Sequence, residues 1–443
     1  MDDFNKRWDE FAVYLPSIQK SFAKATNGAN KKGRVMPDGI SLKTLNFLNP
    51  QNKLWQYKYA LYSAGQFKIG ENQADIVTNR DKANTVILGD SGGFQIGKGT
   101  LAGFTALNKL KTANEVCEAW RGASDLKRWI VDWLETHSDY AMTLDMPLWA
   151  QLPANKNTPF HKCSTKQLID LSVENLEFIK RNRRGNTKWL NVIQGTNSTD
   201  MKLWWDAVKG YRFSGWALAG DTGWRGGSEA VVRQVLMMRD EGAFEPGLDW
   251  IHVLGVSQTK WAVILTAIQK ALRATVNTNI RISYDSASPN IIAGKFEEVA
   301  IFPKFSNRED SWAIGTAPSP NARVYVKDNN IAFPFLSPLG DKMKLHHLNV
   351  VDEEFNPRFY DEISNHLLTH HNIWVYVRSM LQANELAFLD RAEAEQFVPK
   401  NLLALLYLIY ELFTVNDWEA KLKKNLDLFT AVDKMSKDEV IIV

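Results

Sequence analysis

Apolar residues occur along the chain in short runs, and each run is followed by turn residues and then by a longer stretch with apolar positions at helical spacing. Short, wholly apolar runs are typical of strands buried in a parallel sheet. They predict strands at Thr85–Leu88, Tyr140–Leu144, Leu190–Ile193, Trp216–Leu218, Trp250–Leu254 and Arg281–Tyr284. The stretches between them predict crossover helices, among them Glu115–Leu134, Thr165–Arg183, Glu229–Arg239 and Thr259–Ala274. This repeated strand–helix order indicates an α/β protein.

Polar residues or glycines follow the predicted strands: Asp90, Asp145, Gln194, Gly220-Asp221, Gly255 and Asp285. Functional groups lie at strand C-termini both in (β/α)8 barrels and in doubly wound open sheets. The spacing of the repeats favours the (β/α)8 TIM barrel. Its first strand is expected before about residue 65 and its last after Asp285.

The pattern becomes helical from about residue 355 to the end, with helical spacing of apolar residues in Phe359–Leu389 and Leu402–Leu422. We therefore predict a barrel domain with an N-terminal extension over residues 1–355 and a C-terminal helical region over residues 356–443. The most apolar stretch, Leu402–Phe413, is about 12 residues long and contains Glu411, too short to span a bilayer. No membrane contact is expected.

Composition narrows the class of protein. The chain has 443 residues, of which 45% are hydrophobic and 23% charged, as in soluble globular proteins. A net charge of +3 from 53 basic and 50 acidic residues means that any nucleic-acid contact must come from local patches. Cys117 and Cys163 are too few for a disulfide framework or a four-thiolate zinc site, and the N-terminus lacks the order of a secretory signal. We expect a cytoplasmic protein.

The first candidate site is Gly89-Asp90-Ser91-Gly92-Gly93-Phe94-Gln95. Gly92 and Gly93 would let a planar ligand approach the backbone, and Asp90 and Ser91 could hydrogen-bond to it. A plain tight turn is the alternative for the glycine pair. The nucleophile of chymotrypsin-like proteases has a similar setting, but those enzymes place a histidine before the serine, and the first histidine here is His137.

Three further positions suit a purine. Asp145 ends an apolar strand, where its carboxylate would accept the N1–H and the exocyclic amine of guanine. The Gln194 amide suits the O6 and N7 edge of the base, and backbone N–H groups of Ala219-Gly220 suit the same edge. Each has a structural alternative: a helix N-cap for Asp145 and an ordinary loop residue for Gln194.

Asp285 lies in Ser283-Tyr284-Asp285-Ser286 at a predicted strand end. A carboxylate there can attack an anomeric carbon, and the glycosyl-enzyme is then opened from the same side by a second acceptor, as in retaining glycosidases. An Asx-turn is the alternative role for this residue.

Taken in order over about residues 85 to 290, these elements resemble the tRNA-guanine transglycosylase superfamily. The family's Asp-Ser-Gly-Gly-Phe-Gln block matches Asp90 to Gln95, and its other elements look like Asp145, Ile193-Gln194-Gly195, Ala219-Gly220, Val253-Leu254-Gly255-Val256 and Asp285. The resemblance implies a TIM barrel and exchange of guanine for a 7-deazaguanine, such as the 7-cyano form. It also implies that Asp285 is the nucleophile, that Asp90 is the acid/base group and that no cofactor is required.

Members of that family that modify tRNA carry a zinc site of three cysteines and a histidine. His371-Asn372 occupies the histidine position here, but the cysteines are absent, so we expect no metal and a structural His371. The chain is most similar to the branch that lacks them, the 7-deazaguanine DNA transglycosylases of bacterial and phage DNA modification. That favours DNA over tRNA and admits partner proteins of such a system. The alternatives are a tRNA-modifying enzyme and an inactive nucleic-acid-binding barrel, against which both aspartates argue.

Basic runs are candidate phosphate contacts. They are Lys31-Lys32-Arg34 and Lys180-Arg181-Arg183-Arg184, and Trp224-Arg225 is a candidate for stacking on a base. The alternative for such runs is a solvated helix face.

Overall fold

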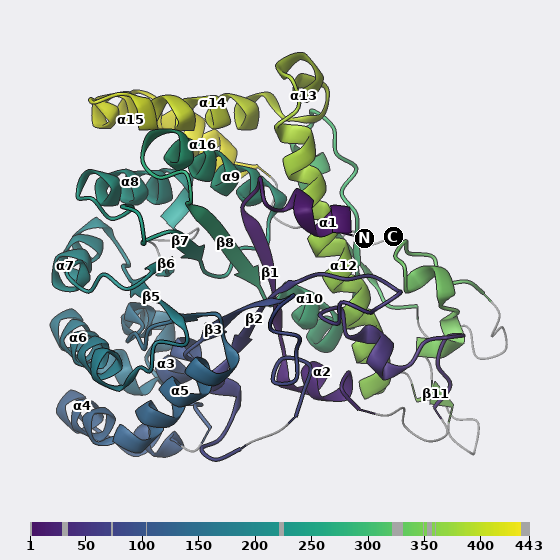
Figure 1. Ribbon diagram of the computed structural model, residues 1–443, viewed down its shortest axis with the longest axis horizontal. Helices are drawn as coiled ribbons and strands as arrows, with labels where there is room; N and C mark the ends of the chain where they lie inside the picture. The colour runs from purple at the N-terminus through teal and green to yellow at the C-terminus, as the bar shows by residue number, and fades with distance from the viewer. Residues whose placement is uncertain are drawn as a thin grey trace.

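The centre of the molecule is a closed barrel of eight parallel strands that follow one another in sequence order (Figure 1). The computed structural model describes residues 2–28, 34–71, 74–102, 104–220, 226–320, 331–348, 350–351, 357–358 and 360–435. The strands are β1 Val13–Ile18, β2 Tyr59–Ser63, β3 Val86–Asp90, β4 Tyr140–Met142, β5 Lys188–Ile193, β6 Gly215–Leu218, β7 Trp250–Val253 and β8 Arg281–Ser286. The predicted (β/α)8 TIM barrel is confirmed, and the six predicted strands correspond to β3 to β8.

The expectation of a last strand after Asp285 is wrong. Both missing strands precede residue 65, and β8, which contains Asp285, closes the barrel against β1 with Leu15 opposite Asp285. Pro16 explains why β1 is hard to recognise, because proline has no N–H for the strand ladder and is rare within strands.

Helices form the outer layer. They are α2 Lys20–Ala25 after β1; α3 Gly93–Lys98, α4 Ala113–Gly122 and α5 Ser124–His137 after β3; α6 Thr165–Asn182 after β4; α7 Ser198–Val208 after β5; α8 Gly227–Asp240 after β6; and α9 Thr259–Thr275 after β7. The predicted single helix Glu115–Leu134 is wrong. The helix ends after Gly122, and the chain turns at Ala123, which has φ −78° and ψ 42°. Glycine explains this end, because only proline has a lower helix propensity.

Short elements occupy the connections and the segment after the barrel. They are α1 Asp2–Arg7, η1 Leu42–Leu45, η2 Ala64–Gln66, η3 Thr105–Lys109, η4 Leu148–Gln151, η5 Pro153–Asn155, η6 Pro159–Lys162, α10 Ser288–Ile291, η9 Ile292–Phe296, β9 Glu298–Ile301, η10 Glu309–Trp312, β10 Gly315–Pro318, η11 Gly340–Lys342, η12 Leu345–Leu348, β11 Val350–Val351 and β12 Pro357–Arg358. β9 pairs with β10, and β11 with β12, as two small antiparallel sheets outside the barrel.

The predicted C-terminal helices are present as α12 Glu362–Ala387, α13 Arg391–Phe397, α14 Lys400–Thr414, α15 Trp418–Lys424 and α16 Leu426–Lys434. α12 runs beside β1 and α9, and its Tyr376 ring stacks on Tyr14 of β1 at 6.2 Å (Figure 1). Buried residues lie on all sides of α12, so this helix is enclosed by the rest of the molecule along most of its length. It therefore takes the place of an outer barrel helix against β1.

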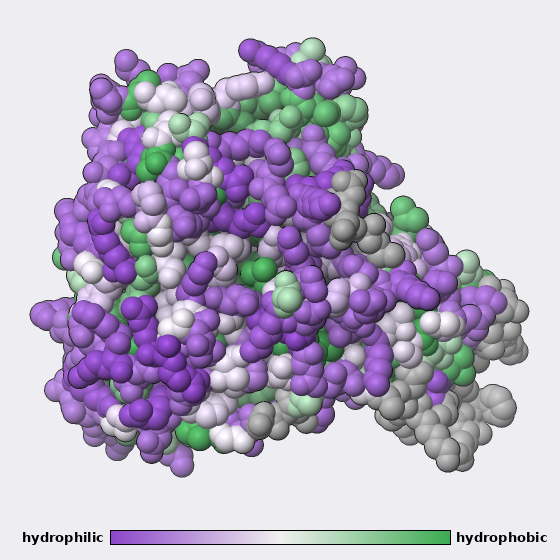
Figure 2. All heavy atoms as spheres, in the orientation of Figure 1, coloured by the Kyte–Doolittle hydropathy of each residue, from purple (hydrophilic) through white to green (hydrophobic). Residues whose placement is uncertain are grey.

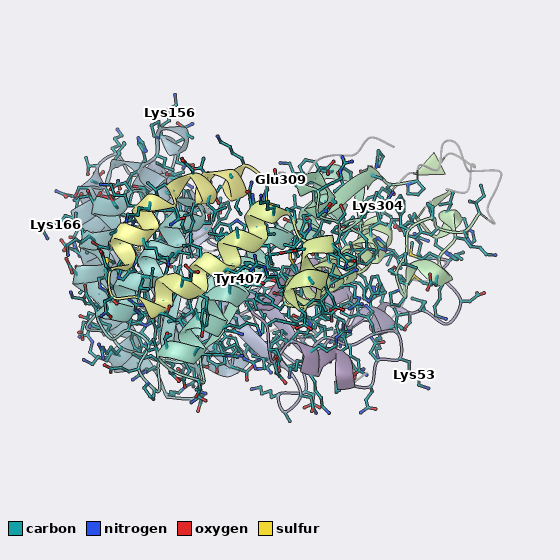
Figure 3. The ribbon with its side chains drawn as sticks, turned by 90° about the horizontal axis from the view of Figure 1, so that it is seen from above. Lys53, Lys156, Lys166, Lys304, Glu309 and Tyr407 are labelled. Atoms are coloured by element: carbon teal, nitrogen blue, oxygen red, sulfur yellow. The ribbon has the colours of Figure 1, made fainter. Side chains whose placement is uncertain are left out.

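The last helices are joined to the barrel by polar contacts as well as by apolar packing. The ammonium of Lys260 in α9 donates to the carbonyls of Val432, Asp433 and Met435 at 3.0, 2.9 and 2.8 Å, and so caps the C-terminus of α16. α14 packs on α9, and Tyr407 lies on its outer side (Figure 3).

The face in Figure 2 is mainly hydrophilic, with apolar atoms showing in scattered areas, the largest of them at the upper right. Within the described part of the chain, none of the helices has the length and apolar character needed to cross a membrane.

Candidate active site

Asp285 faces the barrel interior near the carboxyl end of β8. Its neighbour Tyr284 packs against Tyr14, which in turn stacks on α12 outside the barrel, so alternation along the strand turns Ser283 and Asp285 inward. The backbone N–H of Gly255, in the loop after β7, donates to Asp285 Oδ1 at 2.8 Å. One carboxylate oxygen is thus held by the backbone, which leaves Oδ2 to be presented to a ligand.

A row of polar side chains inside the barrel leads to Asp285. Trp250 Nε1 donates to Ser283 Oγ at 2.8 Å, and Ser283 Oγ lies 2.9 Å from His252 Nδ1. A hydroxyl that accepts from the indole can still donate, and donation to Nδ1 places the imidazole proton on Nε2. His252 Nε2 lies 3.3 Å from Asp285 Oδ1, without the alignment of a hydrogen bond.

Asp90 ends β3, opposite Ser63 of β2. Burial raises the pKa of its carboxyl, hydrogen bonds from Ser63 and from the N–H of Gly92 oppose the rise, and the charge of Asp285 adds to it. The Gly92 N–H donates to Asp90 Oδ1 at 3.2 Å. A carboxyl with a raised pKa that lies within electrostatic reach of Asp285 can hold and release a proton beside it.

Asp145 lies just past the end of β4 and is buried, with 8% of its surface exposed. Burial raises the pKa of its carboxyl to about 7; the hydrogen bond from Gln194 opposes this rise, and the charge of Asp90 adds to it. Gln194 Nε2 donates to Asp145 Oδ2 at 2.5 Å. Gln194 Oε1 is buried and has no partner within the described residues, a state that costs about 1–3 kcal/mol and that a ligand N–H would relieve.

The two glycines after β3 bring the backbone close to this pocket. Gly92 has φ +93°, a left-handed conformation that favours glycine, and it caps the start of α3. A side chain on Gly93 would place its Cβ 3.2 Å from Asp145 Oδ1. Phe94 follows with 62% of its surface exposed, and its ring lies 5.7 Å from that of Trp149 in η4. An exposed aromatic ring therefore follows directly after the glycine that lies against Asp145.

Three predicted binding residues, Gly220, Ala219 and Ser91, differ in their position and in their hydrogen-bond partners. Gly220 lies beside Gln194, because a Cβ at Gly220 would be 3.3 Å from Gln194 Oε1. The N–H of Ala219 donates to Ile193 O at 2.9 Å, which corrects the expectation that it is free for a base. Ser91 is fully buried and its hydroxyl donates to Thr143 O at 3.1 Å, so this side chain joins β3 to the segment after β4 instead of offering a ligand contact.

His371, which the resemblance places at the position of a zinc-binding histidine, makes contacts of a structural kind. His371 Nδ1 lies 2.8 Å from Ser337 Oγ, and Nε2 lies 3.1 Å from Ala300 O, so both ring nitrogens have protein partners. In the part of the chain that the structure describes, no three His, Cys, Asp or Glu side chains are grouped in a way that could hold a metal ion.

The basic run at the end of α6 lies away from the mouth of the barrel. Helices run antiparallel to the strands of the barrel, so residues 180–184 at the end of α6 lie at the amino end of the strands, away from Asp145. Arg34 is bound to Asp361, with Nε 3.0 Å from Oδ2. Lys31, Lys32, Asp221, Trp224 and Arg225 lie outside the described residues.

His252 and Ser283 are the site residues that the sequence did not point to. Ser283 stands two residues before Asp285 in β8, and His252 stands two residues after the inward-facing Trp250 in β7, so the period of two in each strand was the available signal.

No family model and no curated protein matches the sequence. Among solved structures, the chain is similar to a GH10 xylanase from termite gut that contains a bacterial Ig-like domain. The alignment covers 64% of this chain and 69% of the xylanase chain, with 7% sequence identity and a TM-score of 0.35. A likeness this slight carries no argument about function.

Proposed function

We propose that the chain is a transglycosylase that replaces guanine in DNA with a 7-deazaguanine through a glycosyl ester of Asp285. The observation that carries the proposal is the meeting of three carboxyl groups at the carboxyl mouth of one barrel, in three different environments. Asp285 is held by a backbone N–H and faces an imidazole, whereas burial raises the pKa values of Asp90 and Asp145. Perturbed carboxyls in a barrel mouth are typical of acid/base sites.

The reaction has two displacements at the sugar C1′. In the first, Asp285 Oδ2 bonds to C1′ and the bond from C1′ to guanine N9 breaks; the protonated carboxyl of Asp90 gives its proton to the departing base. In the second, Asp90 takes the N9 proton of the incoming 7-deazaguanine, N9 bonds to C1′, and the ester to Asp285 breaks. Two inversions retain the configuration of the sugar.

Guanine recognition is assigned to the pair formed by Asp145 and Gln194. The free lone pairs of the Asp145 carboxylate would accept the N1–H and the 2-amine, and the unpartnered Gln194 Oε1 would accept a further N–H. The exposed ring of Phe94 supports stacking on a base. The target base would have to be unpaired or flipped out of a duplex to reach them.

The test is nucleoside mass spectrometry of DNA and RNA after incubation with the protein and isotope-labelled guanine or 7-cyano-7-deazaguanine. We expect label in DNA nucleosides with the wild-type protein and none with Asp285→Asn. Label in RNA alone would identify the tRNA-type activity, and an Asp285→Asn variant that still exchanges base would refute the role of the nucleophile.

A further inference from the structure

Two segments lead directly from the candidate catalytic residues and carry lysines without any acidic residue. Residues 91–114 follow Asp90 and contain three lysines; residues 146–165 follow Asp145 and contain two. At the average content of this chain, which has 50 Asp and Glu in 443 residues, these 44 residues would contain about five acidic residues, and they contain none. The five lysines are Lys98, Lys109, Lys111, Lys156 and Lys162.

The two segments pack together into one body. A Cβ on Gly97 would lie 2.7 Å from the Trp149 ring, so α3 and η4 are in close contact. Lys98 Nζ donates to Asn155 Oδ1 at 2.8 Å, and the ammonium of Lys162 donates to Lys111 O. Lysines from both segments therefore share one surface.

Most of this positive charge is open to solvent. Lys109, Lys111, Lys156 and Lys162 are exposed, and Lys98 is half-buried with its ammonium 5.1 Å above the Trp149 ring. Figure 3 shows Lys156 projecting outward from the molecule. The first segment is bounded in sequence by Asp90 and Glu115, and the second by Asp145 and Asp170. The Glu115 carboxylate accepts from the backbone N–H of Lys111 at 2.9 Å and lies within electrostatic reach of Lys162.

We propose that this lysine surface, residues 91–102, 104–114 and 146–165, binds the backbone of a single-stranded polynucleotide and leads it to the carboxylates. The partner follows from chemistry: repeated ammonium groups match repeated phosphates, and the exposed Phe94 at the edge of the surface suits an unpaired base. The inference rests on the proposed function, and it places the entry of the strand on the side of α3 and η6.

The test is binding of a fluorescein-labelled single-stranded oligonucleotide, measured by anisotropy at several salt concentrations with Asp285→Asn, so that no base is exchanged. The test variant is Lys109→Glu with Lys156→Glu, one exposed lysine from each segment. Within the described residues the side chains of Lys109 and Lys156 make no hydrogen bond or ion pair. The matched control, Lys423→Glu with Lys424→Glu, makes the same charge change at exposed positions of α15.

Each lost phosphate contact lowers the slope of log Kd against log salt by about 0.7 for a single strand. For the test variant, which loses two contacts, this slope should therefore be lower than that of the parent by about 1.4. If the two proteins bind equally at 1 M salt, the variant should bind roughly 25-fold more weakly than the parent at 0.1 M salt. The control should stay within about twofold of the parent. Equal losses in both variants, no loss in either, or tighter binding of a duplex than of a single strand would overturn the inference.

Two further comparisons show whether the bound strand is DNA or RNA, and whether the binding surface and the proposed function fail together or separately. DNA and RNA strands of one sequence are compared, and the tighter of the two identifies the partner. If the lysine variant binds as predicted while the wild-type protein exchanges no base in either strand, the proposed function fails and the binding surface stands.

Discussion

Asp145 gives the sharpest prediction because its pKa of about 7 lies within the range where the enzyme can be assayed. In the proposed mode of recognition, guanine binds the ionised carboxylate, which accepts two N–H donors. We therefore expect the KM for guanine to be nearly constant above about pH 8 and to rise about tenfold for each pH unit below 7, where the proton must be removed before the base binds.

The substitution Asp145→Asn removes this titration and replaces one acceptor by a donor. Each lost charge-assisted hydrogen bond is worth about 1.5–3 kcal/mol, so the efficiency of guanine exchange should fall by more than about 100-fold. The residual KM should no longer depend on pH. A labelled-guanine exchange assay from pH 5.5 to 8.5 measures both effects, and Asp170→Asn, an aspartate on the surface of α6 bound to Lys166, is the matched control.

The same carboxyl should affect stability with the opposite sign to activity. Because its pKa is higher in the fold than in the unfolded chain, ionisation of Asp145 destabilises the empty protein as the pH rises from about 4 to above 7. Asp145→Asn should therefore raise the free energy of unfolding at pH 8, by on the order of 1–4 kcal/mol, while activity falls. A wild-type KM that is flat across this range, or an Asn variant with normal exchange, would refute the reasoning.

Three further predictions follow from other contacts. Asp285→Asn should abolish a covalent protein–nucleic acid adduct on denaturing gels, and any surviving adduct would move the nucleophile elsewhere. His252→Gln can still offer an N–H to Asp285, whereas the shorter side chain of His252→Asn reaches only Ser283. We therefore expect kcat to be at least about tenfold lower in His252→Asn than in His252→Gln, with an unchanged KM for the base. Equal kcat values in the two variants would mean that His252 only fills space. Burial lowers the pKa of His370 to about 3, so its neutral form is held in the fold and stability is lost as the pH falls below about 6.5. His370→Gln should therefore remove about 2 kcal/mol of the loss in unfolding free energy between pH 7 and 5, as measured by urea denaturation, and an unchanged pH dependence would contradict the assignment.

The six strands β3 to β8 were predictable because each is a short, mainly apolar run that ends at or just before a polar residue or a glycine. β1 was not, since Pro16 interrupts its pattern, and a run of two helices looked like one because the helical spacing continues across Gly122. Asp90, Asp145 and Asp285 were predictable as strand ends, and the barrel brings Asp90 within electrostatic reach of both other carboxyl groups.

What a residue contacts could not be predicted from its position alone. Ser91 stands beside Asp90 in sequence, yet its hydroxyl is bonded to Thr143 O, because successive residues at a strand end face opposite sides. The arginines at the end of α6 form a charge run, but the run does not say which end of the barrel it borders. The lysine surface has the opposite character, since its residues are scattered in sequence and only the packing of α3 against η4 and η6 gathers them.

The position of the carboxylates also limits how a substrate can lie. The rings of Tyr140 in β4 and Trp250 in β7 meet inside the barrel with centroids 4.1 Å apart, and because β4 and β7 are not neighbours this contact crosses and closes the interior below the site. A ligand must then enter from the mouth. Asp145 belongs to the β4 side and Asp285 to β8, so a nucleotide that satisfied both would span the mouth, with its base towards β4 and its sugar towards β8. A strand led in over the lysine surface would pass Asp145 first, and its base would be read before C1′ reaches the nucleophile.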